Sequence, residues 1–522
     1  MRFFTGIIVI MLSLFTALGD AVYQCEFKPD QLKDWAIPQF GAIETVNGCQ
    51  ALRVSVSPEY GIGKMNFVSR KFDLDQYRNK ILIFSCKIKA DQVTMPRQAW
   101  NGVKLMVNFR TGEQETWKQI SDAWGTFDWK DFSVSFSVPD DARNGTLLLG
   151  LQDCSGTVWF ADCKVSMFEP ESLYAKPSIP ENFKAEYTSR VSDMSNLRGV
   201  MSPGKYRKGD LDDLAKWRAN LIRWQLVRAW GKAGTDRDRV EYFKWIDAQI
   251  TDLEQVLADA GRLGIKVVID LHSPPGGRNA TRDMAMFYEE KYAKQFIEVW
   301  ERIARKFKGH PAVWGYDLIN EPVQTMPALY DYLTIQIMAA KAIRQIDPDV
   351  PVIIESNEWD NPGSFKYLSP LPMKDVIYQV HMYIPGEFTN QGVKNNWGEK
   401  SKDNLSTYPG LIGGKEYNRE ALSQALQPVI DFQKKYGVRI YVGEFSAVRW
   451  APGAAKYLED CISIFEEHNW DWSYHAFREW SGWSVEHGSD WNNNATVSQD
   501  TDRKKVLLKW FEKNQKQSGS KK

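Results

Sequence analysis

The sequence predicts an all-β sandwich followed by a (β/α)8 (TIM) barrel, and its two halves have different apolar rhythms. Residues 22–168 carry short stretches of alternating apolar and polar residues between turn residues, which is typical of a β-sandwich. Residues 194–515 alternate short apolar runs with longer stretches whose apolar residues recur every three or four positions. The length of 522 residues also exceeds what one hydrophobic core usually serves.

The first 21 residues have the pattern of a secretory signal peptide. Arg2 precedes an apolar stretch over residues 3–18, and small residues follow it. The apolar run is shorter than the roughly 20 residues that a membrane span needs. We therefore expect a secreted protein without a membrane span, located in the extracellular space, in a periplasm or on a cell surface.

The composition excludes several classes of partner. Basic and acidic residues balance at 66 each, and the chain has no basic cluster that would follow a phosphate backbone, so we expect no nucleic acid partner. Five of the six cysteines precede residue 170, and none has zinc-site spacing. Whether disulfides form within the first domain, and how its cysteines would pair, stays open. We expect a monomer that needs no metal ion or organic cofactor.

Several segments of the first domain alternate like strands. They are residues 51–56, 80–88, 102–107, 130–136, 146–151 and 156–160. With Phe72-Asp73-Leu74, the run 125–129 and the closing run 156–162, this order resembles jelly-roll carbohydrate-binding modules with a galactose-binding-like fold. Whether the domain binds sugar or acts as a spacer stays open. The candidate sugar platforms are Trp100, Trp117, Trp124 and Trp129.

A proline-containing stretch, residues 169–193, is the expected linker and entry to the barrel. Barrel strands are expected to begin near Leu197, Leu221, Lys266, Val313, Val352, Val376, Val438 and Trp472. Helices are expected over residues 240–263, 284–307, 330–346, 420–436, 454–469 and 501–513. A doubly wound open sheet is the alternative, but it would normally carry a glycine-rich phosphate loop after its first strand, and the sequence has none.

Two glutamates stand at the ends of predicted strands. The run 313–319 ends in Asn320-Glu321-Pro322, and the run 438–443 ends in Glu444. Barrel enzymes place their chemistry at the carboxyl ends of the strands. A pair of carboxylates at that end is what retaining hydrolysis of a glycosidic bond requires, because one protonates the leaving oxygen and the other attacks the anomeric carbon.

Across residues 175–515 the second domain resembles glycoside hydrolase family 5, the cellulase-like barrel family. The matching residues, each at a predicted strand end, are Arg223, His272, Asn320-Glu321-Pro322, His381, Tyr383, Glu444 and Trp480. The resemblance implies that Glu321 is the general acid and later the base, and that Glu444 is the nucleophile. Glu321 then has to be protonated near neutral pH, which the negative charge of Glu444 would favour.

The same resemblance implies roles for the other matching residues. Arg223 and Tyr383 would keep Glu444 ionised by charge and hydrogen bonds. Asn320 would bind the sugar 2-hydroxyl, and Trp480 would form the floor under the sugar that is cleaved. The two histidines, His272 and His381, would position the substrate or orient Glu321. Glu355, Arg478 and Glu479 share this rim without an assigned catalytic role.

The expected function is a retaining β-glycoside hydrolase that acts on a plant or microbial β-glycan, with β-1,4-glucan as the first expectation. β-Mannan, β-1,3-glucan and xyloglucan remain alternatives, because loops rather than strand ends set that choice. Transglycosylation would use the same covalent intermediate. The alternative from another class is a non-catalytic glycan-binding surface protein. The presence of both carboxylates together with Arg223 and Tyr383 argues against it.

Overall fold

The computed structural model describes residues 19–514 except 99, 113, 122, 175, 229–234, 280–281 and 394–403. Nearly all of the predicted signal peptide therefore lies outside the described residues. The chain divides into two compact units. The first comprises the chain up to Tyr174 with the segments 278–283 and 324–331, and the second comprises residues 175–277, 284–323 and 332–522.

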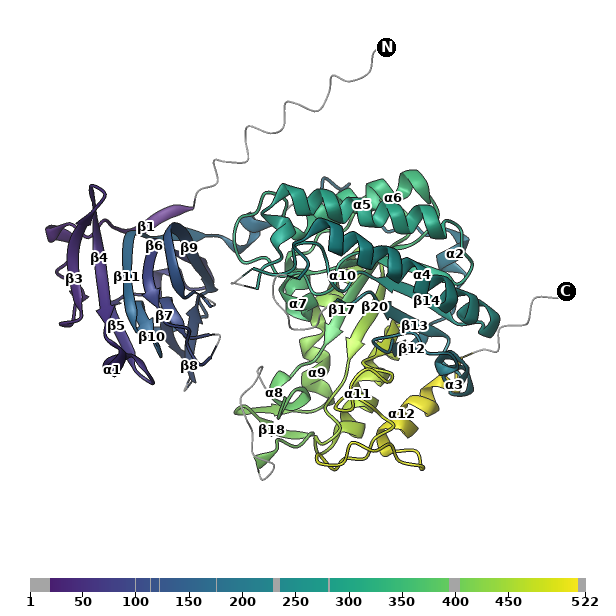
Figure 1. The fold of residues 1–522 in the computed structure, drawn as a ribbon. Coiled ribbons are helices and arrows are strands. Elements are labelled where there is room, and N and C mark those ends of the chain that lie inside the picture. The colour runs from purple at the N-terminus through teal and green to yellow at the C-terminus, as the bar shows by residue number, and fades with distance from the viewer. Residues whose placement is uncertain are drawn as a thin grey trace, which may run out of the picture. The chain divides into compact units, whose positions relative to one another are not determined.

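The first unit is an all-β region of antiparallel sheets (Figure 1). Its six-stranded sheet contains β1 (Asp20–Cys25), β3 (Gly41–Val46), β4 (Cys49–Val56), β6 (Ile81–Val93), β9 (Gly125–Ser137) and β11 (Gly156–Phe168). Its five-stranded sheet contains β2 (Trp35–Ala36), β5 (Met65–Lys71), β7 (Gly102–Thr111), β8 (Gln114–Gln119) and β10 (Arg143–Gln152). A short helix, α1 (Pro58–Gly61), follows β4. All six strands expected from the alternation overlap an observed strand.

One hydrophobic core draws on both sheets of this unit. Leu149 of β10 and Phe160 of β11 are fully buried and belong to the same cluster. The cysteines Cys86 and Cys163 lie in that core with their Sγ atoms 2.9 Å apart, and none of the six cysteines is in a disulfide. The alternation read from the sequence is thus the inward and outward alternation of a sandwich.

The second unit is a closed barrel of eight parallel strands. They are β12 (Arg198–Met201), β13 (Leu221–Gln225), β14 (Lys266–Asp270), β15 (Val313–Asp317), β16 (Val352–Glu355), β17 (Val376–Met382), β20 (Arg439–Phe445) and β21 (Asp471–Tyr474). Pairing of β12 with β21 closes the ring. Each strand begins within one residue of its predicted start, because strands covered on both faces read as short continuous apolar runs.

Helices alternate with these strands along the chain (Figure 1). They are α2 (Ser189–Ser192), α3 (Asp210–Lys216), α4 (Arg239–Leu263), α5 (Glu290–Phe307), α6 (Tyr332–Ile346), α7 (Asn357–Asp360), α8 (Gly386–Thr389), α9 (Arg419–Ala425), α10 (Gln427–Tyr436), α11 (Ala454–Glu467) and α12 (Asp502–Phe511). A hairpin of β18 (Gly410–Ile412) and β19 (Lys415–Tyr417) lies in the loop after β17. None of the described helices combines the length and apolarity that crossing a membrane requires.

Two helices differ from their expected bounds for identifiable reasons. The stretch 420–436 forms two helices, because Pro428 lacks an amide hydrogen and stands in the first turn of α10. α5 begins at Glu290 rather than near Met284, because a 3-10 turn, Ala285–Phe287, precedes it. α4 matches closely. The Asp238 side chain caps its first turn by accepting from the amide of Glu241, and Gly264 ends it with a φ of 72°.

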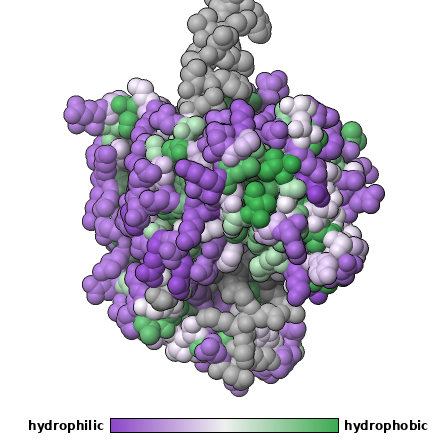
Figure 2. Space-filling model, turned by 90° about the vertical axis from the view of Figure 1, so that its left-hand side faces the viewer, coloured by the Kyte–Doolittle hydropathy of each residue, from purple (hydrophilic) through white to green (hydrophobic). Residues whose placement is uncertain are grey.

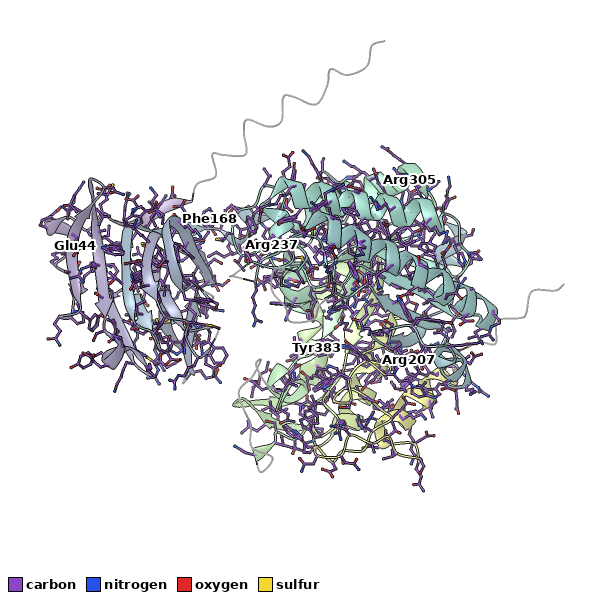
Figure 3. All side chains as sticks on the ribbon, viewed as in Figure 1. Glu44, Phe168, Arg207, Arg237, Arg305 and Tyr383 are labelled. Atoms are coloured by element: carbon purple, nitrogen blue, oxygen red, sulfur yellow. The ribbon has the colours of Figure 1, made fainter. Side chains whose placement is uncertain are left out.

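Apolar side chains lie mainly in the interior of each unit. Figure 2 shows one face of the molecule, on which hydrophilic side chains predominate and hydrophobic ones gather in a smaller area. Inside the barrel, Val268, Trp314, Ile353 and Tyr441 pack in one cluster. The polar residues of the barrel strands follow this cluster toward the carboxyl ends, where Tyr383 comes directly after β17 (Figure 3).

Candidate active site

A fully buried arginine organises the carboxyl ends of the barrel strands. Arg223 of β13 donates from Nη1 to Glu444 Oε1 at 2.6 Å and from Nε to Asp317 Oδ2 at 2.7 Å. Its Nη2 donates to Glu355 Oε1 at 3.1 Å. Its Nη2 also lies 3.3 Å from Asp270 Oδ2 of β14. One guanidinium thus contacts carboxylates from four other strands, which fixes their side chains and offsets part of their charge.

A second set of hydrogen bonds joins β14 to the loop after β15. Asp270 Oδ2 lies 2.9 Å from His272 Nδ1, and His272 Nε2 lies 3.3 Å from the Asn320 amide nitrogen. The Asn320 Oδ1 atom in turn accepts from Arg223 Nη2 at 2.9 Å. Asn320 is therefore held from both sides, with its amide nitrogen next to the histidine.

Glu444, at the end of β20, is bound at both of its oxygens. Oε1 accepts from Arg223, and Oε2 accepts from the Tyr383 hydroxyl at 2.9 Å. Burial alone would raise the pKa of Glu444, but the positive charges of His381, His475 and Arg223 outweigh burial and hold the pKa well below its ordinary value. Glu444 is consequently ionised at neutral pH.

Glu321 faces Glu444 from the loop after β15. Its backbone has a φ of 51°, and its amide donates to Glu355 Oε2 at 2.6 Å. A left-handed backbone is uncommon for a non-glycine residue and is held here by that hydrogen bond. The Glu321 side chain is 23 % exposed, and its Oε1 lies 3.2 Å from His381 Nδ1. One oxygen of Glu321 and one of Glu444 lie within 4.8 Å of each other.

The histidine between these two carboxylates carries a positive charge at neutral pH. Burial alone would lower the pKa of His381, but Glu444, Glu321 and Asp360 outweigh it and raise the pKa to about 9. Its Nδ1 lies 3.2 Å from Glu321 and 3.8 Å from Glu444. His381 therefore lies between the two glutamates and offsets part of the negative charge of Glu444.

The polar residues to which the resemblance assigned roles lie around one centre. Arg223 is hydrogen-bonded to Asn320 and to Glu444, and Tyr383 is hydrogen-bonded to Glu444. His272 joins this group through Asn320, and His381 contacts both glutamates. Glu355, left without a role by the sequence, positions the backbone of Glu321. Burial raises the pKa of Glu355 well above its ordinary value, although Arg223 opposes the shift.

The structure adds two residues after β21 that the sequence interpretation did not assign. His475 Nδ1 contacts the Tyr383 hydroxyl and lies 3.4 Å from Glu444 Oε2, while its Nε2 lies 2.7 Å from Glu479 Oε2. Glu479 is one of the rim residues to which the sequence assigned no catalytic role.

Trp480 belongs to an aromatic group beside this centre and is 40 % exposed. Its ring meets Trp450 at 5.9 Å and Trp483 at 5.4 Å, and Trp483 is the one that packs against Tyr383 and His475. Beyond this group, Trp450 stacks on Trp491 at 4.3 Å. Trp480 thus presents a partly exposed aromatic surface at the rim, linked to the catalytic centre through Trp483.

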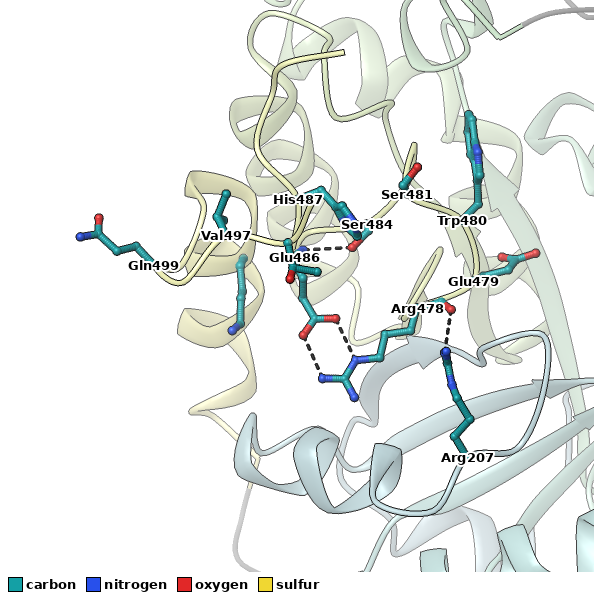
Figure 4. A pocket seen from close by; sticks show the side chains of 12 residues that line it. Arg207, Arg478, Glu479, Trp480, Ser481, Ser484, Glu486, His487, Val497 and Gln499 are labelled. Atoms are coloured by element: carbon teal, nitrogen blue, oxygen red, sulfur yellow. Dashed lines mark hydrogen bonds and ion pairs between the residues drawn. The ribbon is translucent and has the colours of Figure 1, made fainter. Parts of the chain in front are cut away.

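A cavity of about 510 Å³ adjoins Glu479 and Trp480 (Figure 4). Arg478 crosses it and pairs with Glu486 through two contacts, at 2.9 and 3.0 Å. The backbone carbonyl of Arg478 also accepts from Arg207 at 3.1 Å. The Arg478 side chain is thus part of an ion-pair network with Glu486 and Asp210.

The spacing of Glu321, His381 and Glu444 is also compatible with a metal site. The donors already bound to Glu444 disfavour that interpretation. A guanidinium 2.6 Å from one oxygen repels a cation, and the Tyr383 hydroxyl occupies the other oxygen. The arrangement suits proton transfer and nucleophilic attack better than cation binding.

A closed parallel barrel with two facing carboxylates at the carboxyl ends of its strands is the architecture of a barrel-type glycosidase. The family model for cellulases, glycosyl hydrolase family 5, matches residues 186–481. Because this range spans more than half of the chain, the protein belongs to glycosyl hydrolase family 5.

Curated relatives agree with this assignment. Endoglucanase C of Acetivibrio thermocellus is 27 % identical over 241 residues, which is 42 % of this chain and 69 % of the relative. Cellodextrinase A of Ruminococcus flavefaciens is 25 % identical over 302 residues, or 55 % of this chain and 85 % of the relative. The structure of Thermotoga maritima Cel5A with cellobiose has a TM-score of 0.48 at 23 % identity, covering 60 % of this chain and 97 % of that one. The protein is a cellulase-like glycosidase.

Proposed function

We propose that the protein is a secreted, retaining β-1,4-glucanase that works by double displacement. The observation that supports the retaining mechanism is the distance between the two carboxylates. An oxygen of Glu321 and an oxygen of Glu444 lie within 4.8 Å. Retaining glycosidases hold their carboxyl groups about 5–5.5 Å apart, whereas inverting ones leave roughly 6.5–9.5 Å for a water molecule.

In the first step, Glu444 attacks the anomeric carbon while Glu321 protonates the leaving oxygen. The buried Glu444 carboxylate keeps its negative charge because Arg223 and Tyr383 bind its two oxygens. In the second step, Glu321 takes a proton from water, and that water releases the sugar from Glu444. Glu321 is the more exposed of the two glutamates. This exposure suits a group that exchanges protons with the leaving group and with water.

The surrounding residues position the sugar. Asn320 presents its amide beside the two glutamates and is held by Arg223 and His272, so it is suited to bind the 2-hydroxyl. His381 orients Glu321. Trp480 and Trp483 offer aromatic faces on which sugar rings can stack.

The mechanism is tested by following the anomeric configuration of the first product by proton NMR. We expect the β-anomer to appear first and to mutarotate later. A 2-deoxy-2-fluoro glycoside with a good leaving group should label Glu444, which peptide mass spectrometry would locate. First appearance of the α-anomer would contradict the retaining mechanism.

The substrate is tested with purified β-glucans, β-mannan and xyloglucan by release of reducing ends. Glu444→Gln serves as the control for contaminating activity, and its circular dichroism should match the wild type. We expect cleavage of β-1,4-glucan by the wild type alone. Cleavage of another backbone would redirect the substrate assignment, and binding without cleavage would favour a glycan-binding protein.

A further inference from the structure

The centre contains a histidine and a glutamate that the double displacement does not itself use. His475 is 8 % exposed and follows β21 directly, and Glu479 lies four residues later. They are joined at 2.7 Å between His475 Nε2 and Glu479 Oε2. On its other side, His475 Nδ1 contacts the Tyr383 hydroxyl. The pair therefore forms the outer end of a chain of polar groups that leads to Glu444.

Few hydrogens can be donated within this series of polar groups. The direction of each hydrogen bond in it therefore depends on which nitrogens of His475 are protonated. Tyr383 has one hydroxyl hydrogen but two neighbours within reach, Glu444 Oε2 at 2.9 Å and His475 Nδ1. If His475 carries hydrogens on both nitrogens, its Nδ1 donates to the tyrosine oxygen, and the tyrosine hydrogen is free to bind Glu444. If Nδ1 is unprotonated, it accepts the tyrosine hydrogen and competes with Glu444.

We propose that the Glu479–His475 pair is a positioning device for this enzyme, which directs the Tyr383 hydroxyl to the nucleophile Glu444. It deepens the proposed double displacement and rests on it. Glu479 binds Nε2 of His475 and favours the imidazolium form. The Nδ1 of the imidazolium then donates to the Tyr383 oxygen. Tyr383 then donates to Glu444, which stays aligned for attack. His475 and Glu479 act through Tyr383 and are positioning residues.

The charges around His475 support the imidazolium form. The groups that face it are Tyr383 and His381 from β17 and the segment after it, Glu444 from β20, and Glu479. Burial alone would lower the pKa of His475, but Glu479 and Glu444 outweigh it, so the pKa is raised although His381 opposes the shift. Burial also raises the pKa of Tyr383 well above its ordinary value, which keeps the hydroxyl protonated.

The first arm of the test is kinetic. Glu479→Gln, Tyr383→Phe and the double variant are compared with wild type on an aryl β-cellobioside whose leaving group needs no proton. We expect Glu479→Gln to lower kcat about tenfold, the size of a lost charge-assisted hydrogen bond, with little change in KM. The alkaline limb of its pH profile should move to lower pH, because a neutral amide no longer favours the imidazolium.

The double variant separates positioning from general damage. If the pair acts through Tyr383, adding Glu479→Gln to Tyr383→Phe should cost less than about threefold. An equal loss in both backgrounds would overturn the proposal and indicate a merely structural role. A rise in KM alone would overturn it as well, since His475 would then contact the sugar. Glu459→Gln on α11, a carboxylate paired with Lys509, is the matched control and should leave kcat and the pH profile unchanged.

The second arm needs no turnover and keeps the proposal apart from the proposed function. The His475 ring is followed by nitrogen-15 NMR across pH in wild type and Glu479→Gln without substrate. We expect a doubly protonated ring at pH 7 in the wild type and a titration midpoint at lower pH in the variant. A neutral ring at pH 7 in the wild type would overturn the positioning device, even if hydrolysis with retention is established. Absence of hydrolysis beside a protonated ring would instead count against the proposed function.

Discussion

The two units of this protein place their charged residues differently. The first unit pairs most of its charges at the surface, as in Arg53 with Glu44, whose side chains are 30 % and 40 % exposed. Glu44 lies on the outer side of strand β3 (Figure 3). The second unit buries Arg223 completely among Asp317, Glu355 and Glu444. The same type of guanidinium–carboxylate contact therefore occurs in two very different environments.

The difference between the two units shows which features stabilise a fold and which build a functional site. The sandwich core is largely apolar and holds single buried charges such as Lys104, and burying charge costs free energy unless every charge is compensated. The barrel buries one pair at the amino ends of its strands, Arg439 with Asp471, but gathers its largest cluster of buried charges at the carboxyl ends, while its interior remains apolar around Trp314 and Ile353. A cluster of buried charges with strongly shifted pKa values is therefore a sign of a site rather than of a fold.

The largest effect is expected from replacing the buried guanidinium. Arg223→Met leaves the carboxylates Asp317, Glu355 and Glu444 without their shared cation. We expect the free energy of unfolding of the second unit to fall by about 3–5 kcal/mol and turnover to be lost. Calorimetry and the glycosidase assay measure the two effects. Near-wild-type stability would show that the carboxylates compensate one another by taking up protons.

The sequence predicts the fold well because each unit repeats one rhythm. Strands β12 to β21 are short apolar runs between helical stretches, and their number and order follow directly. The expected single helix 420–436 was wrong at Pro428, a local feature that overrides the apolar spacing. Among the residues of the centre, those in short motifs, such as Asn320-Glu321-Pro322, could be placed from the sequence.

Residues whose role depends on distance in space could not be predicted. Glu355, at the end of β16, binds the amide of Glu321, which follows the neighbouring strand β15. His475 meets Tyr383 although 92 positions separate them in the chain. No pattern of spacing reports such contacts, because they depend on the ring closure between the first and last strands and on loop conformation. The rule that polar residues at strand ends serve the site gave Glu355 as a rim residue without a role, and it applies equally to His475.

A cavity in the sandwich core should be nearly as destabilising as the loss of Arg223, without its effect on activity. Leu149→Ala removes a fully buried side chain from the cluster that joins both sheets. We expect a loss of about 3 kcal/mol in the first unit. Hydrogen exchange of β10 amides should quicken while kcat on a soluble aryl glycoside stays unchanged. A matching loss of kcat would indicate that the integrity of the sandwich governs the barrel.

The buried histidine of the barrel should make its stability depend on pH. The pKa of His381 is raised from 6.5 to about 9, so its proton favours the folded state. That contribution is complete below about pH 6.5 and is lost as the pH rises through 9. Compared with His381→Asn, the wild type should gain on the order of 2 kcal/mol at pH 6 and almost nothing at pH 10, as measured by denaturant unfolding. A difference that is constant across this range would attribute the effect to packing.

The smallest effect is expected from the surface counterpart of Arg223. Arg53 on β4 donates to Glu44 Oε1 at 2.6 Å, a distance equal to that between Arg223 and Glu444. Water and salt screen the exposed pair, and Glu44 keeps a second donor, the Trp159 indole, at 3.1 Å. Arg53→Met should therefore change the free energy of unfolding by less than about 1 kcal/mol. Because the substitution is the same as at position 223, the ratio of the two losses measures how far burial, rather than contact distance, sets the strength of an ion pair.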